Sequence, residues 1–390
     1  METIYLDSNA TTRPAEEVVA AMAEALRAGW ANPSSLHRPG QAARRQVELA
    51  RESVSRLIGC RPGELVFTSG GTESANLAIL GSLAARPDRN LLLTSRLEHG
   101  TVRQLAERLA GRGTEVIWLA HDVCGLVDLD SLGHLLATRA DRIGLVSIMW
   151  VNNETGVIQP VPRIARLCRE HGVLFHTDAT QYVGKLPVDL SSVAVDLLSF
   201  SAHKFHGPQG IGGLYLRQGV RIEPQVIGGP QEQERRGGTE NVAGIVGLGA
   251  AATLARAWLA TGERDRLAGI RDDFERRVRQ RVGAVSVNGG SAPRIWDTSN
   301  LAFSHLEAEA ILLMLSERGV CASAGAACSS GSTEPSAVLE AMGIAPPLVR
   351  GSIRFGLGRD TTEPQIDRAV EIIVEVIAKL RMAVIEEVTK

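Results

Sequence analysis

Short apolar segments alternate with helical patterns through the first half of the chain, and this alternation constrains the fold most strongly. The aliphatic-rich segments predicted as strands are 64–68, 90–94, 115–119, 143–149, 174–178 and 197–201. The segments with helical periodicity are 14–28, 41–57, 73–84, 102–110 and 164–171. This order predicts an α/β fold with a mostly parallel sheet covered on both faces. Ligands of such sheets bind at the carboxyl ends of the strands.

The pattern changes near residue 255. A long helical stretch is followed by shorter strands and two further helices, which is typical of a second, smaller α+β domain; these segments are 244–281, 301–304, 307–318, 352–356 and 363–388. A chain of 390 residues also exceeds what one small core accommodates. We predict a large domain over 14–255 and a small domain made of 1–13 and 256–390.

Composition excludes several function classes. The net charge of -2 indicates no polybasic surface for direct nucleic-acid binding. No apolar run is long enough to cross a membrane, and no signal peptide is visible. The five cysteines form an odd, scattered set without a CxxC pair, which argues against a disulfide framework or a zinc site. We therefore expect a cytoplasmic protein without a metal site.

Three polar clusters follow predicted strands. Gly70, Gly71 and Thr72 lie where a strand turns into a helix, and this suits either an anion site or an ordinary helix N-cap. Asp178 ends an apolar strand, where a partly buried carboxylate needs a partner or caps the next turn. Lys204 follows the next strand between two histidines, which would lower its pKa and make it a usable nucleophile.

Further candidates lie outside those clusters. Cys328 sits in a run of tiny residues, which indicates an exposed thiol, either reactive or idle, whereas Cys321 beside Val320 resembles a buried, inert one. His99 is a candidate acid or base. Asn153 alone is most often a turn residue, and Arg354, flanked by Ile and Phe, needs a carboxylate from the protein or a substrate.

Taken together, these clusters resemble the cysteine desulfurases of the NifS/IscS group, in the class V aminotransferase family of fold-type I pyridoxal-phosphate (PLP) enzymes. The likeness covers nearly the whole chain and looks closer to the NifS branch. The segments that carry it are YLDSNATT, NPSSLHRPG, FTSGGTES, LEHGTV, VSIMWVNNETG, FHTDATQYVGKLPVDL, LLSFSAHKFHGPQGIGGLYL, RRGGTEN, ACSSGSTEPS and SIRFGLGR. The resemblance implies a seven-stranded, mostly parallel sheet in the large domain and a small domain that carries the Cys328 loop.

The resemblance also implies roles for individual residues. Lys204 would bind PLP covalently, and Asp178 would pair with its pyridine nitrogen. His99 would stack on the ring and move protons, and Cys328 would be the nucleophile. Gln181 would contact the ring hydroxyl, and Asn153 and Arg354 would orient the substrate carboxylate. The phosphate would be held by Gly71, Thr72, Ser201, His203 and, from the other subunit of a homodimer, Thr239.

The implied activity converts L-cysteine to L-alanine and passes sulfur to Cys328 as a persulfide, then to an acceptor such as an iron–sulfur scaffold protein. Two alternatives remain: a selenocysteine lyase or other class V β-eliminating enzyme, and a non-catalytic sulfur-carrier or assembly subunit. The chain departs from the family pattern in its ASAGAAC run before the nucleophile, in SAHK where many relatives have SGHK, and in the extra thiol of Cys321.

Overall fold

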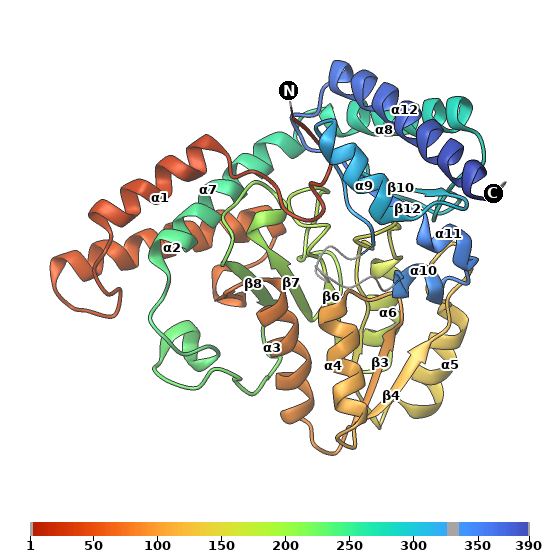
Figure 1. Cartoon of the computed structure of the whole chain (residues 1–390). Helices are drawn as coiled ribbons and strands as arrows, with labels where there is room; N and C mark the ends of the chain where they lie inside the picture. The colour runs from red at the N-terminus through yellow and green to blue at the C-terminus, as the bar shows by residue number, and fades with distance from the viewer. Residues whose placement is uncertain (1–2, 326–334, 389–390) are drawn as a thin grey trace.

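A seven-stranded sheet forms the centre of the computed structural model, which describes residues 3–325 and 335–388 (Figure 1). The strand order is β2-β8-β7-β6-β5-β3-β4. The strands are β2 (Leu65–Thr68), β3 (Leu91–Ser95), β4 (Glu115–Leu119), β5 (Ile143–Ser147), β6 (Phe175–Asp178), β7 (Leu197–Ser201) and β8 (Gly212–Leu216). Only β8 runs against its neighbours within this sheet. The predicted mostly parallel, seven-stranded α/β fold is therefore confirmed.

Helices cover both faces of this sheet. They are α1 (Glu16–Ala28), α2 (Arg38–Ile58), α3 (Gly71–Ala84), α4 (Gly100–Ala110), α5 (Leu129–Arg139), α6 (Val161–Glu170) and α7 (Val242–Leu259). Successive residues of a strand point to opposite faces of the sheet. Leu197 therefore packs with α3 and α4, whereas Leu198 belongs to a larger hydrophobic cluster on the other face. Both neighbours are aliphatic because both faces are covered.

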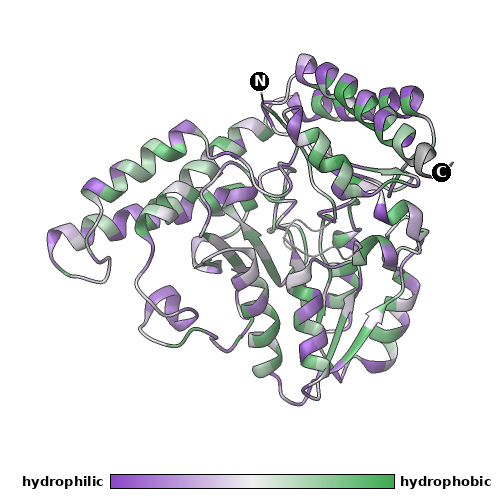
Figure 2. Ribbon diagram, in the orientation of Figure 1, coloured by the Kyte–Doolittle hydropathy of each residue, from purple (hydrophilic) through white to green (hydrophobic). Residues whose placement is uncertain are grey.

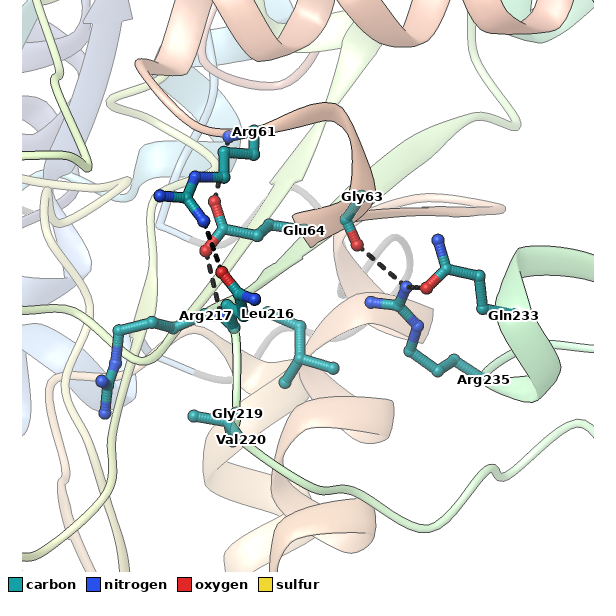
Figure 3. Close-up of a pocket in the computed structure, with 10 residues that line it drawn as sticks. Arg61, Gly63, Glu64, Leu216, Arg217, Gly219, Val220, Gln233 and Arg235 are labelled. Atoms are coloured by element: carbon teal, nitrogen blue, oxygen red, sulfur yellow. Dashed lines mark hydrogen bonds between the residues drawn. The ribbon is translucent and has the colours of Figure 1, made fainter.

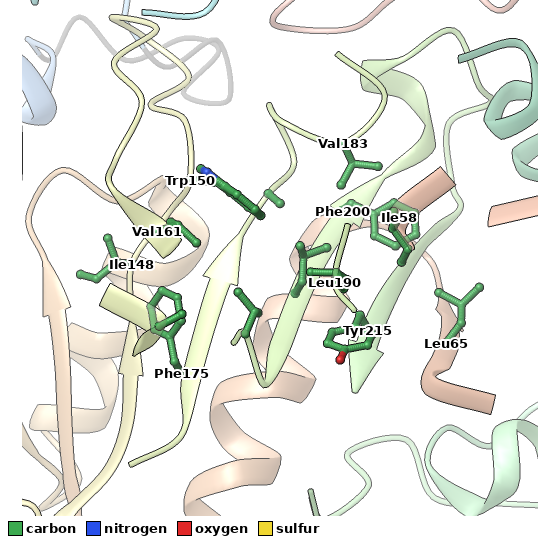
Figure 4. Close-up of a cluster of buried hydrophobic side chains, with 14 of the residues drawn as sticks. Ile58, Leu65, Ile148, Trp150, Val161, Phe175, Val183, Leu190, Phe200 and Tyr215 are labelled. Atoms are coloured by element: carbon green, nitrogen blue, oxygen red, sulfur yellow. The ribbon is translucent and has the colours of Figure 1, made fainter. Parts of the chain in front are cut away.

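The larger cluster is the main hydrophobic core. It joins side chains from α2, α6 and α7 to one face of the sheet, and Figure 4 shows Phe175, Phe200 and Trp150 within it. Trp150 stacks on Tyr182 with ring centroids 3.9 Å apart. This core holds the strand ends rigidly, and those ends carry the polar residues described below.

A second core lies beside the sheet. It forms around the three-stranded sheet β12-β10-β9 and the two-stranded sheet β1-β11. The strands are β1 (Ile4–Tyr5), β9 (Val285–Val287), β10 (Thr298–Phe303), β11 (Val320–Cys321) and β12 (Ser352–Gly356). The helices of this part are α8 (Glu263–Val282), α9 (Ala308–Glu317), α10 (Ala337–Ala341), α11 (Pro346–Arg350) and α12 (Glu363–Val388). The predicted domain limits stay a prediction.

The N-terminal segment packs with the C-terminal part of the chain, because Ile4 and Leu6 join the second core. Apolar residues of α8 and α12 alternate with polar ones along each helix (Figure 2). Within the described residues, α7 is the one helix long and apolar enough to span a membrane, but half of it is buried and it packs against α1 and α2.

Candidate active site

Most of the predicted site residues gather at one edge of the central sheet, where the parallel strands end. Gly71 and Thr72 follow β2, His99 follows β3, and Asn153 follows β5. Asp178 is the last residue of β6, and Lys204 lies in a short 3-10 turn directly after β7. Thr68, the last residue of β2, and Ser201, the last residue of β7, both pair with Gly212 at the start of β8. The carboxyl ends of β2 and β7 therefore lie level with each other on the two sides of β8.

The turn from β2 to α3 forms a cradle for an anion. A Cβ atom added at Gly71 would lie 2.8 Å from Thr180 Oγ1, and one at Gly70 would lie 3.5 Å from Ser201 Oγ. Thr180 Oγ1 is buried and has no hydrogen-bond partner within the described residues. Two close hydroxyls and the N-terminal end of α3 give the donors and positive potential that a phosphate group prefers.

Lys204 and Asp178 lie beside this cradle. Lys204 Nζ donates hydrogen bonds to Asn9 O (2.8 Å) and Ala10 O (2.7 Å). Asp178 is buried, and its Oδ1 accepts a hydrogen bond from Thr180 N at 2.9 Å. A buried carboxylate favours a cationic partner, so the two residues offer one amine and one anion to a bound group.

Two histidines border the same space. Burial, together with the charges of Lys204 and Lys185, lowers the pKa of His203 to about 4, so its ring is neutral near pH 7. His203 Nδ1 lies 3.1 Å from Thr11 Oγ1. His99 is the N-cap of α4, where its ring nitrogen accepts a hydrogen bond from Thr101 N. The cap fixes the direction in which the His99 ring points.

Arg354 reaches the site from the second core. It is 1% exposed on β12, donates to Asn153 O at 3.0 Å, and forms an ion pair with Asp7 at 2.9 Å. Arg354 Nε and Asn153 Oδ1 are buried without hydrogen-bond partners in the described part of the chain. Unsatisfied buried groups are costly, and this pair suits a carboxylate and an amine or hydroxyl of a ligand.

Two buried carboxyl groups at the site were not predicted from the sequence. Burial raises the pKa of Glu98 well above its usual range, although Met149 N donates to it. Burial also raises the pKa of Glu154, against the effects of Ser336 and Arg354. Glu98 precedes His99 in LEHGTV, and Glu154 follows Asn153 in VNNETG. Their positions next to these two candidate residues could have indicated that they belong to the site.

Two predicted residues do not join this cluster. Cys328 lies outside the described residues. Thr239 is exposed in the segment between β8 and α7, and within the described part of the chain it makes no hydrogen bond to the other predicted site residues. The role predicted for Thr239 needs a second subunit.

A surface pocket of about 470 Å³ lies elsewhere (Figure 3). It is lined by Arg61, Arg217 and Arg235 among others, and it borders the end of β8 at Leu216. Because β8 is antiparallel, this pocket lies at the sheet edge opposite to the candidate site. Among the predicted site residues that the structure describes, none lines this pocket.

Comparisons with known proteins agree with this geometry. Residues 4–369 match the family model for aminotransferase class-V. Cysteine desulfurase NifS of Azotobacter vinelandii is 44% identical over 382 residues, which cover 98% of this chain and 94% of that protein.

Two solved structures are also similar. A NifS-like protein has a TM-score of 0.89 and 33% identity, covering 97% of this chain and 100% of its own. A structure of SspA in complex with cysteine has a TM-score of 0.80 and 33% identity, covering 92% of this chain and 99% of its own. The resemblance predicted from the sequence is confirmed, and the chain belongs to the class-V aminotransferase family.

Proposed function

We propose that this protein is a PLP-dependent cysteine desulfurase, which converts L-cysteine to L-alanine and transfers the sulfur to Cys328 as a persulfide. The observation that carries the proposal is the meeting of Lys204, Asp178 and the α3 cradle at one sheet edge, where the buried guanidinium of Arg354 also donates to Asn153 O. Relatives that bear the name cysteine desulfurase, and a similar protein bound to cysteine, support the same activity.

The residues at the site fit PLP. Thr180 Oγ1, which has no hydrogen-bond partner among the described residues, Ser201 and the α3 terminus match a phosphate, and they leave room because Gly70 and Gly71 have no side chains. Lys204 offers the amine for covalent attachment, and Asp178 offers the carboxylate for a protonated ring nitrogen. When bound, PLP withdraws electrons from the substrate carbon next to the carboxylate.

The other residues bind and orient the substrate. Arg354 Nε and Asn153 Oδ1 have no hydrogen-bond partners within the described ranges, so Nε suits the cysteine carboxylate and Oδ1 suits a neighbouring donor group. His99, whose ring is fixed at the start of α4, takes and returns protons at the substrate carbon. His203, whose ring is neutral near pH 7 because burial lowers its pKa to about 4, borders Lys204 without adding a positive charge to the site.

Cys328 receives the sulfur. Its thiolate attacks the sulfur atom of bound cysteine, the carbon–sulfur bond breaks, and the electron pair stays with the carbon fragment that leaves as alanine. An acceptor, such as an iron–sulfur scaffold protein, then takes the sulfur.

The same proposal includes a homodimer and a cytoplasmic location. In the homodimer, Thr239 of the second subunit completes the phosphate site. The free thiols Cys60, Cys124, Cys168 and Cys321 fit a reducing compartment.

Incubation of the PLP-loaded protein with L-cysteine and a reductant tests the proposal. We expect alanine and sulfide in equal amounts, no visible absorbance band in Lys204→Ala, and loss of sulfide release in Cys328→Ala. Cys124→Ala, which alters a half-buried loop thiol distant in sequence, is the matched control and should retain activity. Full activity of Cys328→Ala would instead support a β-eliminating enzyme such as a selenocysteine lyase. A protein that never acquires the band would be a non-catalytic subunit.

A further inference from the structure

We propose that Lys185 is a positioning residue that fixes the orientation of the Gln181 side-chain amide, so that Gln181 presents an N–H group to the cofactor. This inference rests on the proposed function, because it requires that PLP binds beside Gln181. It assigns a task to a buried ion pair, Lys185–Asp297, that the proposed reaction does not otherwise use.

Lys185 belongs to a closed ring of buried polar contacts, made of four hydrogen bonds and one ion pair. Its Nζ lies 2.7 Å from Gln181 Oε1 and 2.7 Å from Asp297 Oδ2. Asp297 Oδ1 accepts from Thr298 Oγ1 at 2.7 Å, and Thr298 Oγ1 accepts from Asn9 Nδ2 at 2.8 Å. Gln181 Nε2 closes the ring by donating to Asn9 O at 2.9 Å.

The chemistry of this ring permits one orientation of the amide. An ammonium group carries three donors and no acceptor, so Gln181 must turn its oxygen toward Lys185. Asn9 O can only accept, so it takes one of the two hydrogens on Gln181 Nε2. The second hydrogen is left for a ligand. Without Lys185, Gln181 Oε1 would lose its charged donor, and Asn9 O alone would hold the amide in this orientation.

Burial makes this constraint strong. Lys185 is 3% exposed and Asp297 is 0% exposed, so water cannot replace either partner. A charged donor gives Gln181 Oε1 a stronger hydrogen bond than a neutral one would. Trp296 Nε1 donates to Lys185 O at 3.0 Å and holds the backbone of Lys185 in place.

The ring also touches Lys204. Asn9 O accepts both from Gln181 Nε2 and from Lys204 Nζ at 2.8 Å. Lys185, Gln181 and Lys204 follow strands of the central sheet, whereas Asp297 and Thr298 lie at the start of β10 in the second core. The ring therefore ties the orientation of Gln181 to the contact between the two cores.

The decisive experiment compares Lys185→Met, Lys185→Arg and Gln181→Ala in the purified protein. In Lys185→Met we expect PLP affinity to fall about tenfold, the effect of one hydrogen bond to a charged group. We also expect the pH midpoint of the visible absorbance band to rise, because an N–H donor stabilises negative charge on the ring oxygen. Lys185→Arg should restore both values in large part, since it keeps the charge and donors.

A double-mutant cycle separates positioning from general destabilisation. If Lys185 acts through Gln181, Lys185→Met should change neither affinity nor midpoint further in a Gln181→Ala background. The control is Arg294→Met, which breaks another buried ion pair, Arg294–Glu275, at 2.6 Å. That variant should lower thermal stability without moving PLP affinity or the midpoint.

The outcomes distinguish the two proposals. Failure of the wild-type protein to bind PLP would overturn the proposed function. Normal wild-type binding with an unchanged Lys185→Met midpoint, or additive effects in the cycle, would overturn only the role of Lys185. If Lys185→Met does not fold, Lys185→Leu serves in its place, and it should show the same rise in midpoint because it also removes the donor to Gln181 Oε1.

Discussion

Burial controls the charge of single residues around the site. It lowers the pKa of His203 to about 4 and raises the pKa of Glu98 and Glu154, so burial favours the neutral form of each of these three groups. Burial also raises the pKa of Cys321, which keeps that extra thiol protonated and a poor nucleophile. Arg354 forms an ion pair with Asp7, which supplies a counter-ion in this setting.

Arg354→Lys should raise the KM for cysteine at least about tenfold, because an ammonium cannot keep the contacts to Asn153 and Asp7 and also offer the N–H that Arg354 Nε offers to a carboxylate. Steady-state kinetics of the PLP-loaded protein measure this. Arg294→Lys is the control, since it alters an arginine of the same core that is paired with Glu275. An equal KM in Arg354→Lys and wild type would contradict the role of Arg354 in binding the substrate.

His176 predicts how stability depends on pH. It is fully buried in β6, between Ser147 Oγ at 2.8 Å and Ser199 Oγ at 3.1 Å, and burial lowers its pKa to about 4. Below its ordinary pKa of 6.5 the unfolded chain binds a proton that the folded protein refuses until about pH 4. Stability from this group is therefore complete above pH 6.5 and is lost as the pH falls toward 4.

Denaturant unfolding of the cofactor-free protein at pH 7 and pH 5 measures this dependence. When the pH falls from 7 to 5, the free energy of unfolding of His176→Gln should decrease by about 2 kcal/mol less than that of the wild type, given the size of the pKa shift. The exposed His134 on α5 supplies the control variant, His134→Gln, which should behave as wild type does. Equal losses in His176→Gln and wild type would show that this histidine is not held neutral.

Turns between elements position the site as much as the elements do. In the turn after β5, Asn152 Oδ1 accepts hydrogen bonds from Glu154 N and Thr155 N, both at 2.9 Å, and this shape directs Asn153 toward Arg354. Gly156 closes the turn with a φ of 76°, a conformation that glycine adopts without strain.

Gly156→Ala should destabilise the protein by about 2 kcal/mol or more and raise the KM for cysteine. An added Cβ would lie 2.7 Å from Thr298 Cβ, so the substitution combines backbone strain with a steric clash. Gly172 has a φ of 65° but no atom within 4 Å of an added Cβ, so Gly172→Ala should cost less and leave the KM unchanged. Thermal unfolding and kinetics of both variants test this, and equal behaviour would count against the clash.

Local sequence signals predicted most elements but not all. The predicted strands 115–119 and 197–201 and the helix 363–388 match β4, β7 and α12, because aliphatic runs and periodicity mark them clearly. β8 was not predicted because it begins with two glycines, which weaken a strand signal. Those glycines are required: a Cβ at Gly212 would lie 2.5 Å from Phe200 O. α5 was also missed, since Gly133 lowers its helix propensity.

Contacts between distant segments explain what the sequence could not predict of the site. Strand-end positions and family motifs placed Lys204, Asp178 and His99 at one edge. The ring through Lys185 and Asp297 joins residues that no local pattern connects, because it depends on how the second core packs against the first.

At the scale of the whole molecule, buried polar contacts join the two cores around the site. Arg354 donates to Asn153 O, Asn300 Nδ2 donates to Glu154 O at 3.1 Å, and Lys185 pairs with Asp297. These contacts satisfy polar groups on both sides and leave the site between two rigid bodies of packed side chains. The opposite end of the molecule is different, because α1 and α2 project from the body there (Figure 1).

Large apolar side chains on this projecting part predict a homodimer. Leu26, Trp30 and Leu36 are 66%, 77% and 88% exposed, and all three lie on or just after α1, before α2 begins. Exposed apolar groups concentrated on one part of a chain favour association. We expect analytical ultracentrifugation to give twice the chain mass of 41.7 kDa.

The double variant Leu26→Asp with Trp30→Asp should sediment as a monomer, because two carboxylates would have to be buried in the interface. It should also bind PLP more weakly, since Thr239 of a second subunit could no longer complete the phosphate site. Leu313→Asp, which changes an exposed leucine of α9, controls for the added charge and should remain dimeric. A double variant that stays dimeric would place the subunit contact on another surface, and a monomer with unchanged PLP affinity would remove Thr239 from the phosphate site.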